Sequence, residues 1–251
     1  MRRLWERLRQ GYRTIDFPEG HTELSPRFRG RPVVDPSRCR AGCRRCADAC
    51  PTAAIQTDPL RLDLGACLFC PSCVENCGEG AITSTNDFRL AARTRGDLVL
   101  SGGEMRLATA LDRRLRKLFG RSLKLRQVSA GGCNACEADL NVTGIVVFDI
   151  GRFGIQFVAS PRHADGIVVT GPVTTNMALA LRETYAAVPE PKLVIAAGAC
   201  AISGGPFAGS STCANGIPAD IPVDLYLPGC PPHPLTILDG LLRLLGRIEN
   251  A

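Results

Sequence analysis

Eight cysteines stand close together near the start of the chain, in two runs of four. The first run reads CRAGCRRCADACP and the second CLFCPSCVENCG. Their cysteines are Cys39, Cys43, Cys46 and Cys50, and then Cys67, Cys70, Cys73 and Cys77. Thiolates are soft ligands that suit iron–sulfur clusters, and four at this spacing indicate a four-iron cluster. The doubled pattern therefore predicts two [4Fe–4S] clusters.

The two runs are predicted to exchange their last ligand. In the doubled run of bacterial ferredoxins, the fourth cysteine of each run ligates the other cluster. Three thiolates on one tight loop cover three irons, but the fourth iron faces away and is reached by a returning segment. Cluster one would take Cys39, Cys43, Cys46 and Cys77, and cluster two would take Cys67, Cys70, Cys73 and Cys50.

Structural zinc and disulfides are the alternative uses of these cysteines. Zinc sites usually draw on two separated pairs rather than four cysteines in one run. Disulfides need an oxidising compartment, which nothing in the sequence favours. Two details depart from the usual ferredoxin run: three residues separate Cys39 from Cys43, and Gly78 stands where many ferredoxins have proline. Neither removes a ligand, and Gly42 tolerates the backbone angles that the extra residue requires.

A third group of cysteines lies in the second half of the chain. Three glycine-rich loops carry them: Gly131-Gly-Cys-Asn-Ala-Cys136, Gly198-Ala-Cys200 and Pro228-Gly-Cys-Pro-Pro232. Each loop follows an apolar, strand-like run, and open α/β sheets bind their ligands at the carboxyl ends of strands. We therefore expect Cys133, Cys136, Cys200 and Cys230 to converge on a third cluster; four buried, unligated thiols are the alternative. Cys213 lies in a separate loop and is predicted to be no ligand.

The segments around these loops alternate between strands and helices. Expected strands are 123–128, 154–160, 166–173, 193–199 and 223–227, and expected helices are 134–148, 175–187 and 235–248. Near-continuous apolar strands separated by helices indicate a parallel sheet covered on both faces. The fold class is therefore α/β, with a ferredoxin-like module of two [4Fe–4S] clusters followed by a flavodoxin-like domain.

Four regions are expected along the chain. They are an extended arm (1–38), the two-cluster module (39–86), a linker with a helix over 104–119 (87–121), and the flavodoxin-like domain with the third cluster (122–251). Residues 1–12 are predicted to form a helix with Leu4, Trp5 and Leu8 on one side. This helix is either a surface anchor on a partner or a membrane face, or a solvated helix end.

Three further side chains near these loops have both a functional and a structural interpretation. Glu137 is a carboxylate beside a cluster ligand, where it could couple proton and electron transfer. It also completes an Asn134-x-x-Glu137 pattern that resembles a capping box. His163, with its neighbour Arg162, and His233 lie near loop ends, and either histidine could titrate near neutral pH.

Charge is divided unevenly along the chain. Up to Arg126 there are 24 basic and 14 acidic residues, whereas the remainder has 6 and 10. The arginines can offset the negative charge of the clusters, and no basic patch interleaved with aromatic residues favours nucleic acid. No run approaches the roughly 18 apolar residues of a membrane span. The first residues match neither a secretory signal nor a twin-arginine leader, so a reducing, cytoplasmic setting is expected.

The motifs of the second half resemble a known family. They are Gly131 to Glu137, Arg152 to Ile155, Ser160 to Asp165, Gly198 to Gly205, and Pro222 to Pro232. Together they resemble the small subunit of group 4 membrane-bound [NiFe]-hydrogenases, especially formate hydrogenlyase, and more distantly the 20-kDa subunit of respiratory complex I. The complex I relatives carry adjacent cysteines where this chain has Cys133-x2-Cys136. Residues 14–32 and the two cysteine runs resemble the two-cluster ferredoxin subunit of the same hydrogenlyase complexes, here fused into one chain.

The resemblance implies an electron-transfer subunit that carries three [4Fe–4S] clusters and holds no complete active site by itself. Its partners would be a large subunit, with nickel–iron or a quinone site, and other hydrophilic and membrane subunits. The complex would lie on the cytoplasmic face of the inner membrane, with this chain peripheral to it. The alternatives are a complex I-like quinone or ferredoxin oxidoreductase without hydrogen chemistry, and a freestanding soluble electron carrier.

Overall fold

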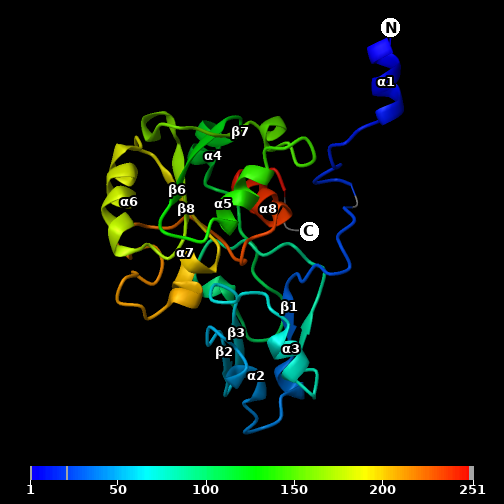
Figure 1. The fold of residues 1–251 in the computed structure, drawn as a ribbon, viewed down its shortest axis with the longest axis vertical. Helices are drawn as coiled ribbons and strands as arrows, with labels where there is room; N and C mark the ends of the chain where they lie inside the picture. The colour runs from blue at the N-terminus through cyan, green and yellow to red at the C-terminus, as the bar shows by residue number, and fades with distance from the viewer. Residues whose placement is uncertain (1, 21, 249–251) are drawn as a thin grey trace.

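The structure is a computed structural model that describes residues 2–20 and 22–248. Figure 1 shows a larger α/β body, a smaller cysteine-rich module below it, and one helix standing away from both. That helix is α1 (Arg2–Gln10), and the module contains the short helices α2 (Arg45–Asp48) and α3 (Ser72–Asn76). Among the described residues, no helix has the length and apolar character needed to cross a bilayer.

The body is built on a five-stranded sheet in which every neighbouring pair is parallel. Its strands are β6 (Leu123–Ser129), β7 (Ile155–Phe157), β8 (Gly166–Thr170), β9 (Leu193–Ala197) and β10 (Leu225–Leu227). They lie side by side in the order β10-β9-β8-β6-β7. Numbered along the chain, this is the 2-1-3-4-5 order of flavodoxin-like folds. The predicted fold class is therefore confirmed.

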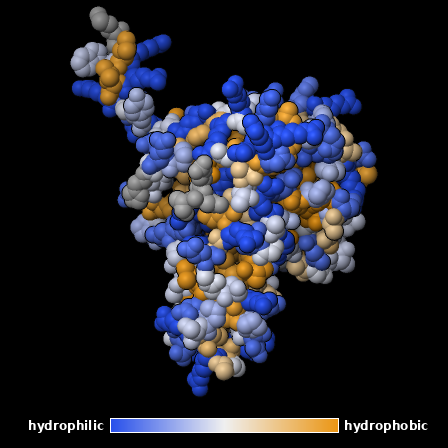
Figure 2. Space-filling model, turned by 180° about the vertical axis from the view of Figure 1, so that it is seen from behind, coloured by the Kyte–Doolittle hydropathy of each residue, from blue (hydrophilic) through white to orange (hydrophobic). Residues whose placement is uncertain are grey.

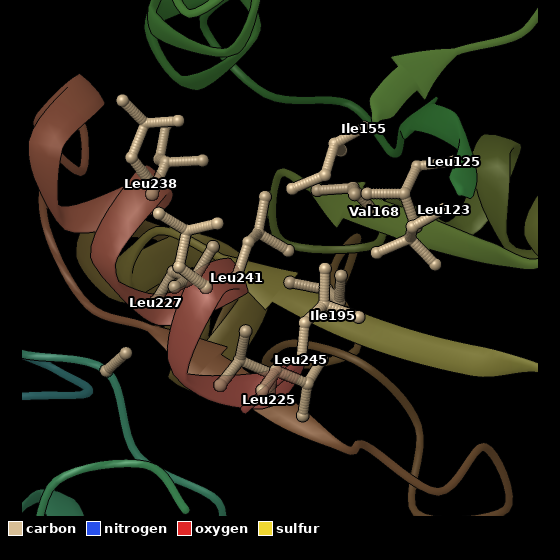
Figure 3. Packing of buried hydrophobic residues seen from close by; sticks show 14 of the residues in the cluster. Leu123, Leu125, Ile155, Val168, Ile195, Leu225, Leu227, Leu238, Leu241 and Leu245 are labelled. Atoms are coloured by element: carbon tan, nitrogen blue, oxygen red, sulfur yellow. The ribbon is translucent and has the colours of Figure 1, made fainter. Parts of the chain in front are cut away.

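Helices cover both faces of this sheet, as its continuous apolar strands predict. They are α5 (Ala135–Val142), α6 (Thr175–Ala187), α7 (Ala199–Ser203) and α8 (Pro234–Leu244). On one face, Leu238 and Leu241 of α8 pack against strand residues such as Ile195 (Figure 3). On the other face, Leu181 of α6 joins a cluster with Val169 of β8. Every residue of β8 and β9 is buried between these two layers.

The cysteine-rich module has two small antiparallel sheets. One contains β2 (Ile55–Thr57), β3 (Leu60–Asp63) and β5 (Val99–Leu100), and the other pairs β1 (Pro32–Val34) with β4 (Ile82–Ser84). Strand β1 belongs to the N-terminal arm and β5 to the segment after residue 86. The module therefore uses residues on both sides of 39–86. Single 3₁₀ turns lie at Pro36–Arg38, Gly96–Leu98, Ile150–Phe153, Pro161–His163 and Gly205–Phe207.

The module and the body share one hydrophobic core. Leu62 and Leu64 of the module belong to the same buried cluster as Ala201 and Ile202 of α7. The two parts are also joined through backbone hydrogen bonds in both directions between Ala92 and Tyr226. Part of the connection between them is thus packed against the body, at Ala92, whereas residues 101–104 are exposed.

The helix predicted over 104–119 is shorter than expected. The structure has α4 only at Arg113–Phe119. Before it, the amide of Ala108 donates to the carbonyl of Ala91 at 2.7 Å, and the amide of Leu111 donates to Leu244 at 2.9 Å. These bonds hold residues 108–111 along neighbouring segments. The apolar residues that suggested a longer helix, such as Met105, Ala108 and Leu111, are therefore buried without forming a helical face. Asp112 then caps α4 by accepting from the amide of Leu115 at 3.0 Å, as N-cap residues do.

The N-terminal arm runs from the body to the module. The amide of Ile15 donates to the carbonyl of Val147 at 2.9 Å, and Arg152 donates to the carbonyls of Ile15 and Phe17. Phe17 is buried in the core beside α8. Further along, the amide of Gly30 donates to Thr85 at 2.7 Å in the module. The predicted helix at the N-terminus is present as α1.

Candidate metal centres

The first group of thiols lies around a cavity of about 430 Å³ at the α2 end of the module. The cavity is lined by the thiols predicted for cluster one, Cys39, Cys43, Cys46 and Cys77. Burial raises the pKa of Cys46, and the neighbouring thiols of Cys77 and Cys39 raise it further. Cys77 therefore lies beside the first run although it belongs to the second. The backbone helps to hold it, since the amide of Ala81 donates to its Sγ at 3.2 Å.

The second group lies on the side of the module nearer the body. Burial raises the pKa of Cys67 to about 12, and the thiols of Cys73, Cys50 and Cys70 add to the rise. Cys50, from the first run, therefore lies among the first three cysteines of the second. Two amides support the sulfurs: Ala54 donates to Cys50 Sγ and Phe69 to Cys67 Sγ, each at 3.3 Å. Such N–H···S bonds are among the interactions that tune cluster potentials.

The third group lies at the carboxyl ends of the central strands. Its loops follow β6, β9 and β10 and bring together Cys133, Cys136, Cys200 and Cys230. Burial raises the pKa of Cys136, and the thiols of Cys200, Cys230 and Cys133 raise it further. Cys133 and Cys230 are exposed, whereas Cys200 is buried. The group therefore has an inner side in the fold and an outer side at the surface.

Glycine allows the backbone to come close to these sulfurs. Gly198 has φ +90°, and a Cβ placed on it would lie 2.5 Å from Cys136 Sγ. A Cβ on Gly205 would lie 3.1 Å from Cys200 Sγ. Any larger residue at Gly198 would push the thiol of Cys136 aside, because real Cβ atoms do not approach so closely. The position therefore requires glycine for both its backbone angle and its space.

Glu137 is buried beside Cys136, with 4% of its surface exposed. Its Oε1 accepts hydrogen bonds from Ser129 Oγ and Thr170 Oγ1, both at 2.6 Å. Burial raises the pKa of Glu137, but these two bonds outweigh it, so the pKa lies below its usual range. The capping-box interpretation is wrong, because Asn134 makes no capping bond and has φ +71°. The carboxylate instead links the ends of β6 and β8.

The two histidines occupy different places. His163 and Arg162 lie on the turn that precedes β8, at the amino ends of the parallel strands. The third group of thiols lies at the carboxyl ends of these strands. His163 and Arg162 line a surface cavity with Lys124 and Glu190. His233 caps α8, since its Nδ1 accepts from the amide of Leu235 at 3.2 Å. It also lines a cavity of about 300 Å³ together with Cys230.

Cys213, which was predicted to be no ligand, is not among the thiols that surround Cys46, Cys67 or Cys136. It pairs with Thr174 as an isolated β-bridge in the loop after α7. The structure thus brings twelve of the thirteen cysteines together in the three predicted groups of four and leaves this one aside.

The junction between the second and third groups could not be read from the sequence. Ser203 Oγ donates to the carbonyls of Gly65 at 2.9 Å and Ala199 at 3.1 Å. Gly65 lies two residues before Cys67, and Ala199 directly precedes Cys200. One hydroxyl therefore touches both ligand loops. Arg95 strengthens the junction through a bidentate pair with Asp63, whose Oδ1 accepts from the amide of Gly65 at 2.8 Å.

The donor sets fit iron–sulfur clusters. All thirteen cysteines are free thiols, which does not match the disulfide alternative. Among the described residues, no three metal-binding side chains gather tightly enough for a single ion. A [4Fe–4S] cluster instead takes one thiolate on each of four irons. The three groups supply four thiols each, with amides directed at several sulfurs and glycine backbone against others.

Comparison with known proteins identifies relatives of the second half. A family model described as NADH ubiquinone oxidoreductase, 20 Kd subunit, matches residues 133–244. A subunit of the NADH-quinone oxidoreductase of Heliobacterium modesticaldum is 46% identical over 122 residues, which are 48% of this chain and 70% of that protein. The probable membrane-bound hydrogenase subunit mbhJ of Pyrococcus furiosus is 40% identical over 54% of this chain and 81% of its own length.

A third relative is formate hydrogenlyase subunit 7 of Escherichia coli. It is 42% identical over 136 residues, which are 54% of this chain and 53% of that protein. All three relatives are subunits of oxidoreductases by their names, so the resemblance read from the motifs and the assignment to an oxidoreductase complex are confirmed. The match to residues 133–244 contains all four cysteines of the third group. The chain belongs to the family of the 20-kDa subunit of NADH ubiquinone oxidoreductase.

Proposed function

We propose that this chain is the electron-transfer subunit of a membrane-associated, hydrogenase-type oxidoreductase and that it carries three [4Fe–4S] clusters. The observation that carries the proposal is the gathering of twelve thiols into three groups of four within one packed chain. A [4Fe–4S] cluster supplies one-electron transfer without making or breaking substrate bonds.

The residues have separate roles in holding these groups. Cys39, Cys43, Cys46 and Cys77 would hold cluster one, Cys67, Cys70, Cys73 and Cys50 cluster two, and Cys133, Cys136, Cys200 and Cys230 the third. Amides such as those of Ala54 and Phe69 stabilise negative charge on the sulfurs. Each thiol would lose its proton on binding iron, because the ligand is a thiolate. Burial, which raises the pKa of Cys67 to about 12, opposes that loss in the absence of iron.

The three groups follow one another along the molecule. The first lies at the α2 end of the module, far from the sheet in Figure 1. The second meets the third through Gly65 and Ser203. Cluster two would therefore stand between cluster one and the third cluster. The exposed thiols of Cys133 and Cys230 mark the side on which a large partner subunit would lie.

Iron and acid-labile sulfide analysis with EPR tests the proposal directly. Three [4Fe–4S] clusters require about twelve irons and twelve sulfides per chain. A protein isolated without oxygen that holds about four irons would retain only one centre and contradict the proposal. Zinc in place of iron would also contradict it.

A complex I-like quinone or ferredoxin oxidoreductase is the second candidate. The family match and the relative in Heliobacterium support it. The spacing of Cys133 and Cys136, which resembles that of hydrogenases, and the two relatives named for hydrogenase or hydrogenlyase favour the first. Nickel in the purified complex, together with two pairs of cysteines in the large subunit, would decide for hydrogen chemistry. A nickel-free complex that reduces a quinone would decide against it.

The remaining partners follow from the same proposal. The chain would bind a large subunit carrying nickel–iron or a quinone site, together with other hydrophilic and membrane subunits. It would be peripheral to the inner membrane on the cytoplasmic face. Co-purification with membrane proteins is expected, and a stable monomer in the soluble fraction would favour a freestanding carrier instead.

A further inference from the structure

The helix α1 has an apolar face that is exposed in the described part of the chain, residues 2–20 and 22–248. Leu4, Trp5 and Leu8 are 68%, 67% and 74% exposed. Positions 4, 5 and 8 lie on one side of a helix, because residues three and four apart are neighbours on its surface. Apolar side chains this exposed usually mark a surface that binds something.

The rest of α1 is strongly basic. Residues 2–13 contain five arginines and one glutamate. Arg7 and Arg9 flank the apolar face on its two sides, as their spacing from Leu4 and Leu8 requires. Figure 2 shows this helix apart from the body, with hydrophobic residues on part of it and hydrophilic residues around them. A short helix with arginine on its polar face and Trp and Leu on the other is typical of segments that lie in a bilayer interface.

The connection of α1 to the body leaves it accessible. The arm that follows α1 is hydrogen-bonded to the body at Thr14, whose Oγ1 donates to the carbonyl of Val146 at 2.7 Å, and at Ile15. At this attachment, Val146 and its neighbour Ile145 are 64% and 47% exposed, and Tyr12 on the tether is 99% exposed. Exposed apolar side chains therefore lie both on α1 and at the point where the arm joins the body.

We propose that α1 binds the surface of an anionic bilayer, with Leu4, Trp5 and Leu8 inserted and the arginines on the headgroups. Charge complementarity selects this occupant, because each arginine near an anionic surface strengthens binding about fivefold. Tryptophan also favours the interface, where its ring is buried and its N–H stays near water. The inference deepens the proposed function, since it names what holds the chain at the membrane, but it requires no cluster.

The chain has a built-in probe for this contact, because Trp5 is its only tryptophan. The full chain, with its iron content measured first, would be mixed with phosphatidylcholine vesicles or with vesicles that also contain phosphatidylglycerol. We expect a blue shift of Trp5 emission and co-flotation only with the anionic vesicles. Both should weaken as salt is raised, because ions screen exposed charges.

Matched variants separate α1 from bulk charge. Arg7→Gln should weaken vesicle binding about fivefold, whereas Arg61→Gln, an exposed arginine on β3 of the module, should change it little. Leu4→Ser with Leu8→Ser should abolish the blue shift. Because α1 stands apart, these changes should leave iron content and EPR spectra intact, so a failure of cluster assembly would be seen separately.

Three results would overturn the inference. One is equal binding to neutral and anionic vesicles. Another is equal loss of binding in Arg7→Gln and Arg61→Gln. The third is a Trp5 emission that is already blue-shifted in the purified, lipid-free complex, which would show that a protein subunit covers α1.

Discussion

The hydroxyl of Ser203 donates to the carbonyl of Gly65 at 2.9 Å and so joins the ligand loop of Cys200 to that of Cys67. The two residues are 138 positions apart. Gly65 has no side chain, and a Cβ there would lie 2.7 Å from Ile202 and 2.8 Å from the Arg95 guanidinium. The junction is thus a close backbone contact completed by one hydrogen bond.

Replacing this hydroxyl tests whether the junction holds the module on the body. Ser203→Ala leaves the Gly65 carbonyl without that partner, which should lower the free energy of unfolding by about 1 kcal/mol. For a chain of this length, the melting temperature should fall by about 3 °C. Iron content should be unchanged, because no thiol is altered, but the EPR interaction between the second and third clusters should change. Ser210→Ala, in an exposed loop, is the control; an equal effect there would remove any special role for Ser203.

Gly198→Ala should remove the third cluster selectively. The added Cβ would meet Cys136 Sγ at 2.5 Å, and φ +90° already disfavours alanine. Iron should fall from about twelve to about eight per chain. Gly209→Ala is the matched control, because Gly209 also has positive φ, at +81°, but nothing lies within 4 Å of a Cβ there and no cysteine ligand loop contains it. Full iron content in Gly198→Ala would show that Cys136 is not a ligand.

The exchange of ligands between the two runs can be tested by counting iron in double variants. If Cys50 serves cluster two, Cys50→Ala and Cys50→Ala with Cys70→Ala should each retain about eight irons, because both changes affect one cluster. Cys50→Ala with Cys43→Ala should retain about four, because it affects two. The opposite pattern would mean that each run binds its own cluster.

Asp87 should contribute stability that does not change between pH 7 and pH 5. Burial raises its pKa, but bonds from Arg89 and the charges of Arg89 and Arg31 outweigh it, so the pKa lies below its usual range. A lowered carboxylate pKa gives stability that is present above the unfolded pKa of about 3.9 and is lost only as pH falls through the lower folded value.

Asp87→Asn should therefore lower the free energy of unfolding by about 2 kcal/mol at both pH values, since charged hydrogen bonds are lost from a side chain only 14% exposed. Urea unfolding of both proteins measures the difference. A difference that shrinks by pH 5 would indicate a raised pKa instead. Asp58→Asn, an exposed aspartate, should have little effect at either pH.

Patterns of neighbouring residues in the sequence were sufficient to predict the central strands, helix α6 and the spacing of the cysteine runs. Strands β8 and β9 were recognisable because their apolar runs are buried on both faces, and α6 was predicted at its observed bounds. The first two cysteine groups could be predicted from spacing because short loops set it, and the role of these cysteines as ligands stays a prediction. The predicted helix over 104–119 was too long, since bonds from Ala108 to Ala91 and from Leu111 to Leu244 hold its first part extended.

Contacts between distant segments explain the rest. Glu137 resembled part of a capping box, but its partners Ser129 and Thr170 come from the ends of two strands. His163 belongs to a motif rich in polar residues, yet the turn before β8 places it at the amino end of that strand, whereas the third group of thiols lies at the carboxyl ends of the strands. The bond from Ser203 to Gly65 has no signal in either residue type.

The common core of Leu62, Leu64, Ala201 and Ile202 has a consequence for cutting the gene in two. If the chain were divided between residues 103 and 113, each half would expose part of this hydrophobic cluster to water, because neither half can cover these side chains alone. The two products would be expected to behave as an obligate heterodimer and to precipitate when made separately.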